Sequence, residues 1–180
     1  MGDQRTKYIL LEGRVGQTVD RNIFNFGLSM STSTQVLRGD LLEALPEAQQ
    51  PQDSTRIALV GIDRKSLRLD CTLECLMRLS DEDANLLLPI SSLEERYQIF
   101  RDRERLDFGR KILPGGKVYA SVKGVKLPGV VWYKGELPSI NGTMFGVELL
   151  VSIPSFSYLI ILSMQLMHSL PCEQSLLRSS

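Results

Sequence analysis

The chain has 180 residues, of which 21 are Lys or Arg and 21 are Asp or Glu, so its formal net charge is zero. Binding to nucleic acid needs clustered positive charge that displaces counterions, and this balance argues against it. Three cysteines and one histidine lack the spacing of zinc ligands, so we expect no metal and no cofactor. A hydrophobic content of 43% is enough for a folded core.

The N-terminal sequence predicts no secretory signal. Its apolar stretch, Tyr8 to Leu11, is only four residues long, whereas a signal peptide needs an apolar region of roughly 7–15 residues. We therefore expect a cytoplasmic protein in which Cys71 and Cys75 are free thiols. Their spacing would place both on one face of a helix.

The first 80 residues carry short and uneven signals. Four segments can be interpreted: a strand at Lys7–Leu11, a loop at Ser29–Thr34, a helical turn at Asp40–Leu45 ended by Pro46, and a strand at Arg56–Val60 closed by Gly61. The stretch from Cys71 to Leu79 fits a helix or a strand equally well.

The clearest helix is predicted at about residues 92–105. Ser91 and Glu94 have the spacing of a capping box. Leu93, Tyr97 and Phe100 form one apolar stripe, and the remaining positions carry acids and arginines that cancel. This charged surface is typical of a solvated helix face, and the alternative is a polar surface for a partner.

After Gly109 the pattern changes to short strands between Gly and Pro turns. Strands are predicted at 117–123, 129–134 and 144–150, which favours a small antiparallel barrel-like module. The predicted fold class is therefore α+β but mainly β, with one clear helix. The predicted domains are an N-terminal region at 1–110, a module at 111–150 and an apolar tail at 151–180.

The module resembles a known family. The sequence from Gly129 to Gly135, followed by a loop and the sequence from Gly142 to Leu149, is similar to a CAP-Gly domain. This resemblance implies an SH3-like barrel that binds microtubules, and hence tubulin, or acidic C-terminal peptide tails. It also implies an association with the cytoskeleton in the cytoplasm.

A second resemblance extends upstream. It is carried by Leu86–Leu88, Glu94–Tyr97 and Phe100, leading into Pro128–Val131. These segments are similar to the N-terminal region of the cylindromatosis (CYLD) family of deubiquitinases. That family implies a parent with a ubiquitin-specific cysteine protease domain and partners in the ubiquitin pathway. The chain is then a truncated fragment, and the alternative is that its function is that of the parent deubiquitinase.

The module departs from the CAP-Gly pattern. Trp132 replaces a usual arginine, Met144 a large aromatic residue and Leu150 an acid. The Gly-Lys-Asn-Asp-Gly loop expected after Leu150, which holds the ligand's carboxyl end, is absent. We therefore expect an incomplete barrel that is either partly ordered or paired by the tail, since its strands would otherwise lack partners.

Nine residues of the module are candidates for its function. Aromatic and sulfur-containing side chains could contact a ligand or fill the core, lysines could meet an acidic tail, and glycines could serve the backbone geometry. They are Trp132, Tyr133, Met144 and Phe145; Lys126 and Lys134; and Gly129, Gly135 and Gly146.

The chain lacks the pattern of a catalytic site. Its single histidine, His168, lies four residues before Cys172, with no orienting group in sequence. Cys71 and Cys75 have no nearby histidine and are interpreted as core residues. We therefore expect no enzymatic activity from this chain.

The segment from Leu149 to Cys172 contains no charged residue. An abrupt change after Leu150 favours an alternative terminus unrelated to the module. The length also suffices for a membrane anchor, although serines, Pro154 and Gln165 interrupt it. The third interpretation is an element of the folded core.

Overall fold

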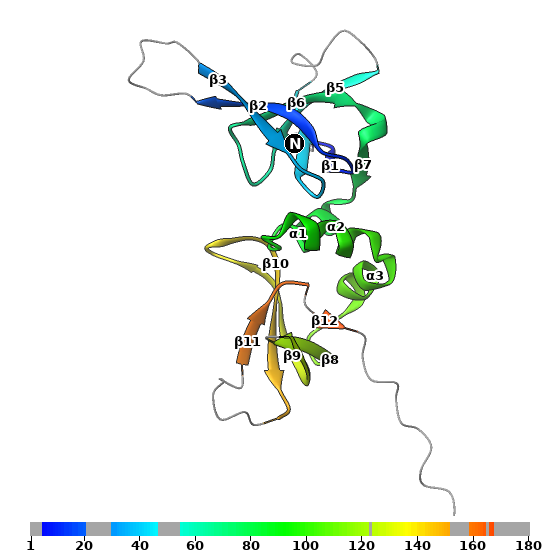
Figure 1. Cartoon of the computed structure of the whole chain (residues 1–180). Helices are drawn as coiled ribbons and strands as arrows, with labels where there is room; N and C mark the ends of the chain where they lie inside the picture. Colours follow the sequence, from blue (N-terminus) through cyan, green and yellow to red (C-terminus); the bar gives the residue numbers. More distant parts are fainter. Residues whose placement is uncertain are drawn as a thin grey trace, which may run out of the picture. The chain divides into compact units, whose positions relative to one another are not determined.

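The computed structural model describes residues 5–20, 30–46, 55–122, 124–151, 159–164 and 166–167. This part of the chain is mainly antiparallel β-structure and contains three α-helices (Figure 1). It divides into two compact units. The first comprises Met1–Ala84 with Ser91–Gln98, and the second comprises Asn85–Ile90 with Ile99–Ser180.

The first unit is built on a seven-stranded antiparallel sheet with the order β3-β2-β6-β5-β4-β1-β7. Its strands are β1 (Lys7–Leu10), β2 (Arg14–Asp20), β3 (Met30–Val36), β4 (Leu41–Ala44), β5 (Arg56–Gly61), β6 (Leu67–Thr72) and β7 (Leu76–Leu79). A 3₁₀ turn, η2 (Leu73–Cys75), joins the last two strands.

The core of the first unit forms from alternating strand residues. In β6, Leu67, Leu69 and Cys71 are buried while Asp70 is exposed, which is the alternation of a half-buried strand. The buried cluster comprises Leu10, Val36, Leu42, Leu59, Leu67, Leu69, Cys71, Cys75 and Leu76, with Tyr8 and Ile57 packed against it.

Two sequence predictions in this unit are wrong. The loop predicted at Ser29–Thr34 is strand β3 from Met30 onward, and it pairs with the whole of β2; Ser29 lies outside the described residues. Thr and Ser are compatible with an exposed strand once a partner strand is present. The helical turn predicted at Asp40–Leu45 is strand β4, because it lies between β1 and β5 and buries both Leu41 and Leu42.

The predicted strands at Lys7–Leu11 and Arg56–Val60 are confirmed as β1 and β5. The ambiguous stretch from Cys71 to Leu79 contains the end of β6, η2 and β7. Cys71 and Cys75 therefore do not share a helix face. Both are buried, and neither forms a disulfide.

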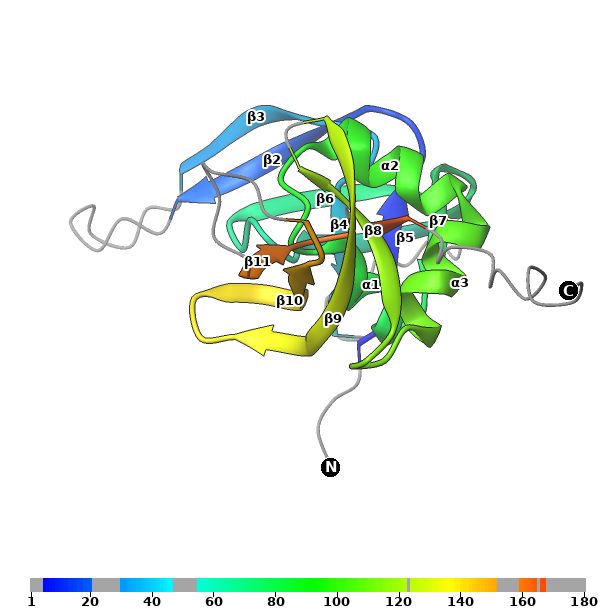
Figure 2. The same cartoon turned by 90° about the horizontal axis from the view of Figure 1, so that it is seen from below.

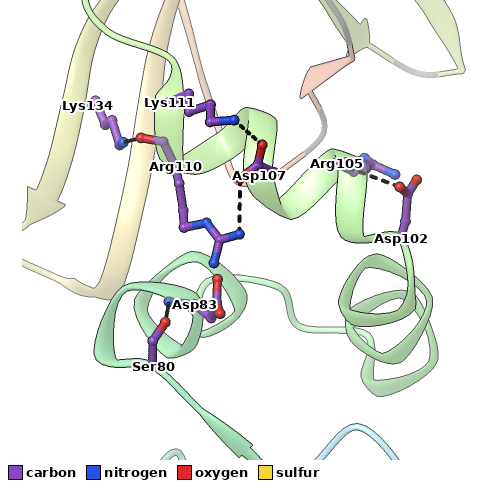
Figure 3. Close-up of polar contacts among 8 residues, drawn as sticks. All are labelled: Ser80, Asp83, Asp102, Arg105, Asp107, Arg110, Lys111 and Lys134. Atoms are coloured by element: carbon purple, nitrogen blue, oxygen red, sulfur yellow. Dashed lines mark hydrogen bonds and ion pairs between the residues drawn. The ribbon is translucent and has the colours of Figure 1, made fainter.

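The single helix predicted at 92–105 is two helices. The described residues contain α1 (Asp81–Leu87), α2 (Leu93–Arg101) and α3 (Arg103–Lys111). The chain breaks at Asp102, whose carboxylate caps α3 by accepting a hydrogen bond from the backbone N–H of Arg105 at 3.0 Å (Figure 3). The cap of α2 is Ser92, one residue later than predicted, whose Oγ accepts from the N–H of Glu95.

The second unit contains a five-stranded antiparallel sheet with the order β11-β10-β9-β8-β12 (Figures 1 and 2). Its strands are β8 (Lys117–Val122), β9 (Val125–Leu137), β10 (Ile140–Leu149), β11 (Leu159–Leu162) and β12 (Leu166–Met167). The three predicted strands are present, and β9 and β10 are longer than predicted. Their hairpin turns through Pro138 and Ser139.

The tail pairs with this sheet, which is one of the two outcomes predicted for an incomplete module. β11 adds to β10 and β12 adds to β8, so both outer strands of the predicted module gain a partner. Met164, between the two tail strands, is fully buried. In the part of the chain that the structure describes, no helix is long and apolar enough to cross a membrane.

Candidate binding surface on the second sheet

Trp132 and Tyr133 are consecutive residues of β9, yet both face solvent. Tyr133 pairs with Gly146 of β10, whereas the next pair is Val131 with Val147, so Trp132 is an extra residue in the ladder. This is a β-bulge, which breaks the strict alternation of a strand. As a result, 65% of Trp132 and 41% of Tyr133 are exposed side by side.

Hydrogen bonds fix the polar ends of both rings. The indole Nε1 of Trp132 donates to Oε2 of Glu148 on β10 at 2.6 Å. The hydroxyl of Tyr133 donates to the backbone oxygen of Glu136 at 2.6 Å. The two side chains are therefore oriented by the sheet itself, with much of their apolar surface in contact with solvent.

The three candidate glycines make room for neighbouring side chains. A Cβ on Gly146 would lie 3.1 Å from the Cβ of Tyr133, and one on Gly135 would lie 2.7 Å from the Tyr133 hydroxyl. A Cβ on Gly129 would instead lie 2.6 Å from a methyl group of Val147, which is fully buried. Two of the glycines thus accommodate Tyr133, and the third accommodates the core.

The remaining candidates occupy different places. Met144 is 7% exposed and Phe145 is fully buried, so both side chains belong to the core in this structure. Lys134 donates from Nζ to the backbone oxygen of Arg110 at 2.6 Å and so connects β9 to the end of α3 (Figure 3). Lys126, in contrast, is exposed near the start of β9.

Strand pairing places two lysines on the same face as Tyr133. Glu148 and Gly146 are two residues apart on β10, so they share a face, and Gly146 is paired with Tyr133. Glu148 is paired with Val130, which is also paired with Lys117 of β8. Lys126 lies four residues from Val130 on the same strand and shares this face too.

We call this surface the aromatic–lysine face, and it comprises Lys117, Lys126, Trp132, Tyr133 and Glu148. The sequence pointed to Lys126, Trp132 and Tyr133 but not to Lys117 or Glu148. The signal for Lys117 was present, since it begins an alternating strand whose buried residues are Val118 and Ala120. The role of Glu148 depends on the bulge and had no signal in the sequence.

Helix α3 carries a charged cluster at its C-terminal end. A hydrogen bond from Lys111, followed by one from Arg110, lowers the pKa of Asp107 (Figure 3). Positive side chains in the last turn also complement the helix dipole. The backbone oxygen of Arg110 accepts the hydrogen bond from Lys134, so this cluster lies where β9 is connected to the helix.

The side chains of the aromatic–lysine face are of the kinds that could contact a ligand. It combines two aromatic rings, two ammonium groups and one carboxylate, with no histidine or thiol among its members. Within the ranges that the structure describes, no group of His, Cys, Asp and Glu side chains could hold a metal ion. The arrangement can recognise a ligand through apolar area and charge.

A comparison with known protein families matches one part of the chain. Residues 35–110 match the family described as the CYLD SH3 domain. The mainly antiparallel fold fits an SH3-like domain, and the match runs from the end of β3 to α3. The aromatic–lysine face lies outside these residues. No solved structure matches the chain.

The relatives are more specific. The chain is 30% identical over 156 residues to ubiquitin carboxyl-terminal hydrolase CYLD of Bos taurus and of Homo sapiens, and 36% identical to that of Pongo abelii. Each match covers 82% of this chain but only 14% of the relative. The chain therefore contains a region like the N-terminal region of CYLD. The matched family describes an SH3 domain and not the catalytic domain.

Proposed function

We propose that the chain is a non-catalytic binding fragment of a CYLD-like protein, and that its CAP-Gly-like module binds acidic C-terminal peptide tails such as those of tubulin in microtubules. The observation that carries this proposal is the aromatic–lysine face. It displays Trp132 and Tyr133 on a fixed bulge, with Lys117 and Lys126 on the same side of the sheet.

The physical basis is complementarity. Aromatic side chains provide large contact areas at a low cost in conformational entropy. Lysines attract carboxylates over about a Debye length and speed the encounter of acidic partners. Among its described residues, the second unit carries more Lys and Arg than Asp and Glu. Since the Gly-Lys-Asn-Asp-Gly loop is absent, we propose that the sheet face itself receives the ligand.

The wider setting is also part of the proposal. The relatives are ubiquitin carboxyl-terminal hydrolases, so the partners of the parent protein would include proteins of the ubiquitin pathway. We propose that this chain contributes binding and no catalysis, in the cytoplasm and on microtubules. Its role would be to bring a CYLD-like protein to microtubules, or to compete with that protein for binding to them.

The test uses the only tryptophan of the chain, which lies in the proposed site. An acidic peptide with a free carboxyl end is titrated against the full chain while Trp132 fluorescence is recorded. We expect a saturable blue shift that weakens with added salt, and no shift with a neutral, amidated peptide of equal length. An equal response to both peptides would contradict the proposal.

Substitutions then separate charge at the site from net charge. Changing Lys117 and Lys126 together to Ala should weaken binding about two- to thirtyfold, because exposed charge pairs contribute about 0.2–1 kcal/mol each. Lys65→Ala combined with Arg38→Ala, which removes two exposed positive charges in the first unit, is the control and should bind as the unchanged chain does. Co-sedimentation with microtubules extends the test to the intact partner, and pelleting at background level would count against microtubules.

A further inference from the structure

In the first unit, an arginine side chain rests on a cysteine sulfur. The guanidinium of Arg14, on β2, donates to Sγ of Cys75 from Nη2 at 2.7 Å and from Nε at 3.2 Å. The hydroxyl of Thr72 lies 3.5 Å from the same sulfur. Cys75 is only 6% exposed, whereas the Arg14 side chain is 42% exposed. The sulfur therefore lies at the rim of the core beneath a solvent-exposed cation.

This arrangement places a fixed positive charge and two N–H donors against a sulfur atom. The thiolate is the nucleophile in cysteine chemistry, and neighbouring Arg or Lys side chains stabilise it. A guanidinium remains charged at all physiological pH values and offers its N–H donors in a rigid fork. The hydrogen bond to Cys75 is the largest cause that raises the pKa of Arg14.

Cys71 provides the contrast within the same core cluster. Burial, followed by the electrostatic interaction with the neighbouring Cys75, raises its pKa to about 11, and no hydrogen bond from Arg14 reaches its sulfur among the described contacts. Cys71 therefore remains a protonated thiol at neutral pH. Two cysteines that are four residues apart and equally buried thus have different chemical environments.

We propose that Cys75 is an oxidation site at which hydrogen peroxide converts the Arg14-bound sulfur to a sulfenic acid. A lone pair of the sulfur attacks one peroxide oxygen, so that an S–O bond forms and the O–O bond breaks. The other oxygen leaves as hydroxide and takes a proton to become water. The sulfur loses two electrons and the peroxide gains them. The N–H groups of Arg14 are placed to hydrogen-bond the new oxygen.

Oxidation at this position would act on the end of the first sheet. The backbone oxygen of Cys75 accepts a hydrogen bond from the N–H of Leu11 at 2.9 Å, directly after β1. Its side chain packs in the cluster that contains Leu10 and Leu76. An added polar oxygen must therefore be accommodated at the rim of an apolar core. This site lies in the first unit and does not depend on the function proposed for the second.

The experiment uses the full chain with Cys172→Ser, so that only Cys71 and Cys75 can react. The protein is treated with hydrogen peroxide in the presence of dimedone, which traps sulfenic acids, and the adducts are located by peptide mass spectrometry. We expect Cys75 to be labelled at least about tenfold faster than Cys71. Arg14→Gln should slow the labelling of Cys75 by about tenfold.

Arg56→Gln is the matched control. Arg56 is also a partly exposed arginine of the first sheet, but it hydrogen-bonds Asp70 and makes no hydrogen bond to the sulfur of Cys75. Equal labelling of the two cysteines in the folded chain, or equal slowing by both substitutions, would overturn the proposal. The first comparison needs no variant, so it stands even if Arg14→Gln fails to fold. Labelling in urea should bring the two rates together.

Discussion

Trp132 and Glu148 are joined across two strands: the extra residue of the β9 bulge donates its indole N–H to a carboxylate of β10 at 2.6 Å. This contact does two things at once. It holds the exposed ring in one orientation, and it keeps a negative charge at the centre of a face that we propose to bind acidic tails. The Glu148 carboxylate therefore helps to orient the Trp132 ring but should weaken the binding of an acidic tail.

Glu148→Gln separates these two effects, because the amide oxygen can still accept the indole N–H while the charge is removed. We expect an acidic peptide to bind about two- to fivefold more tightly, since the energy of an exposed charge pair is about 0.2–1 kcal/mol. The measurement is the fluorescence titration of Trp132. Glu74→Gln, in the first unit, controls for net charge and should leave the affinity unchanged. Weaker binding by Glu148→Gln would mean that the carboxylate takes part in recognition.

Two glycines of the second unit test where space is limiting. Gly115 and Gly142 have positive φ angles of 89° and 96°, so an alanine at either costs about 1–2 kcal/mol in backbone strain. A Cβ on Gly115 meets nothing, whereas one on Gly142 would lie 2.5 Å from the backbone oxygen of Asn85. Gly142→Ala should therefore destabilise more than Gly115→Ala in urea unfolding followed by Trp132 fluorescence. Equal losses would show that the backbone around Gly142 can relax.

The parts of the fold that sequence could predict are those specified locally. In the strand beginning at Lys117, the buried residues Val118 and Ala120 alternate with less buried ones, and Gly124 marks the turn that follows it, where φ is +81°. Strands β3 and β4 could not be predicted in this way. The first is polar and depends on pairing with β2, and the second resembles a helical turn until β1 and β5 enclose it.

The candidate site shows the same division. The aromatic and sulfur-containing residues between glycines point to Trp132, Tyr133, Met144 and Phe145 as candidates, but composition cannot say which of them is buried. The answer depends on a register shift between Gly146 and Val147, which turns Trp132 outward while Phe145 remains in the core. A bulge is a property of two paired strands, and neither strand alone encodes it.

Alkaline pH should destabilise the first unit through Cys71. Its pKa is raised from 9.0 to about 11 in the folded state, chiefly by burial. Between these values the unfolded chain releases the proton and the folded chain retains it, so stability is intact below about pH 9 and falls as the pH rises toward 11. Urea midpoints from circular dichroism should decline over this window, and Cys71→Ala should flatten the decline. An unchanged slope in that variant would assign the effect to another group.

Gly109 and Met164 test whether the tail is part of the folded core. A Cβ on Gly109 would lie 2.4 Å from Sδ and 2.6 Å from Cε of Met164, which is fully buried. For Gly109→Ala, overpacking should cost about 1–3 kcal/mol, and the better helix propensity of alanine inside α3 should offset about 1 kcal/mol of this cost. Met164→Ala should cost about 2–5 kcal/mol through lost contacts and a cavity. Unfolding is followed by Trp132 fluorescence, which reports on the second unit.

The double variant decides the matter. If Met164 packs against α3, removing its side chain gives the new methyl group room, and the two losses should sum to less than their separate values by roughly 0.5–3 kcal/mol. Gly109→Ala combined with Ile161→Ala is the control, because Ile161 is 55% exposed on β11, and these losses should add. Additive losses in the Met164 pair would mean that the Met164 side chain does not pack against α3. The pairing of β12 with β8 would then be the remaining link between the end of the tail and the sheet.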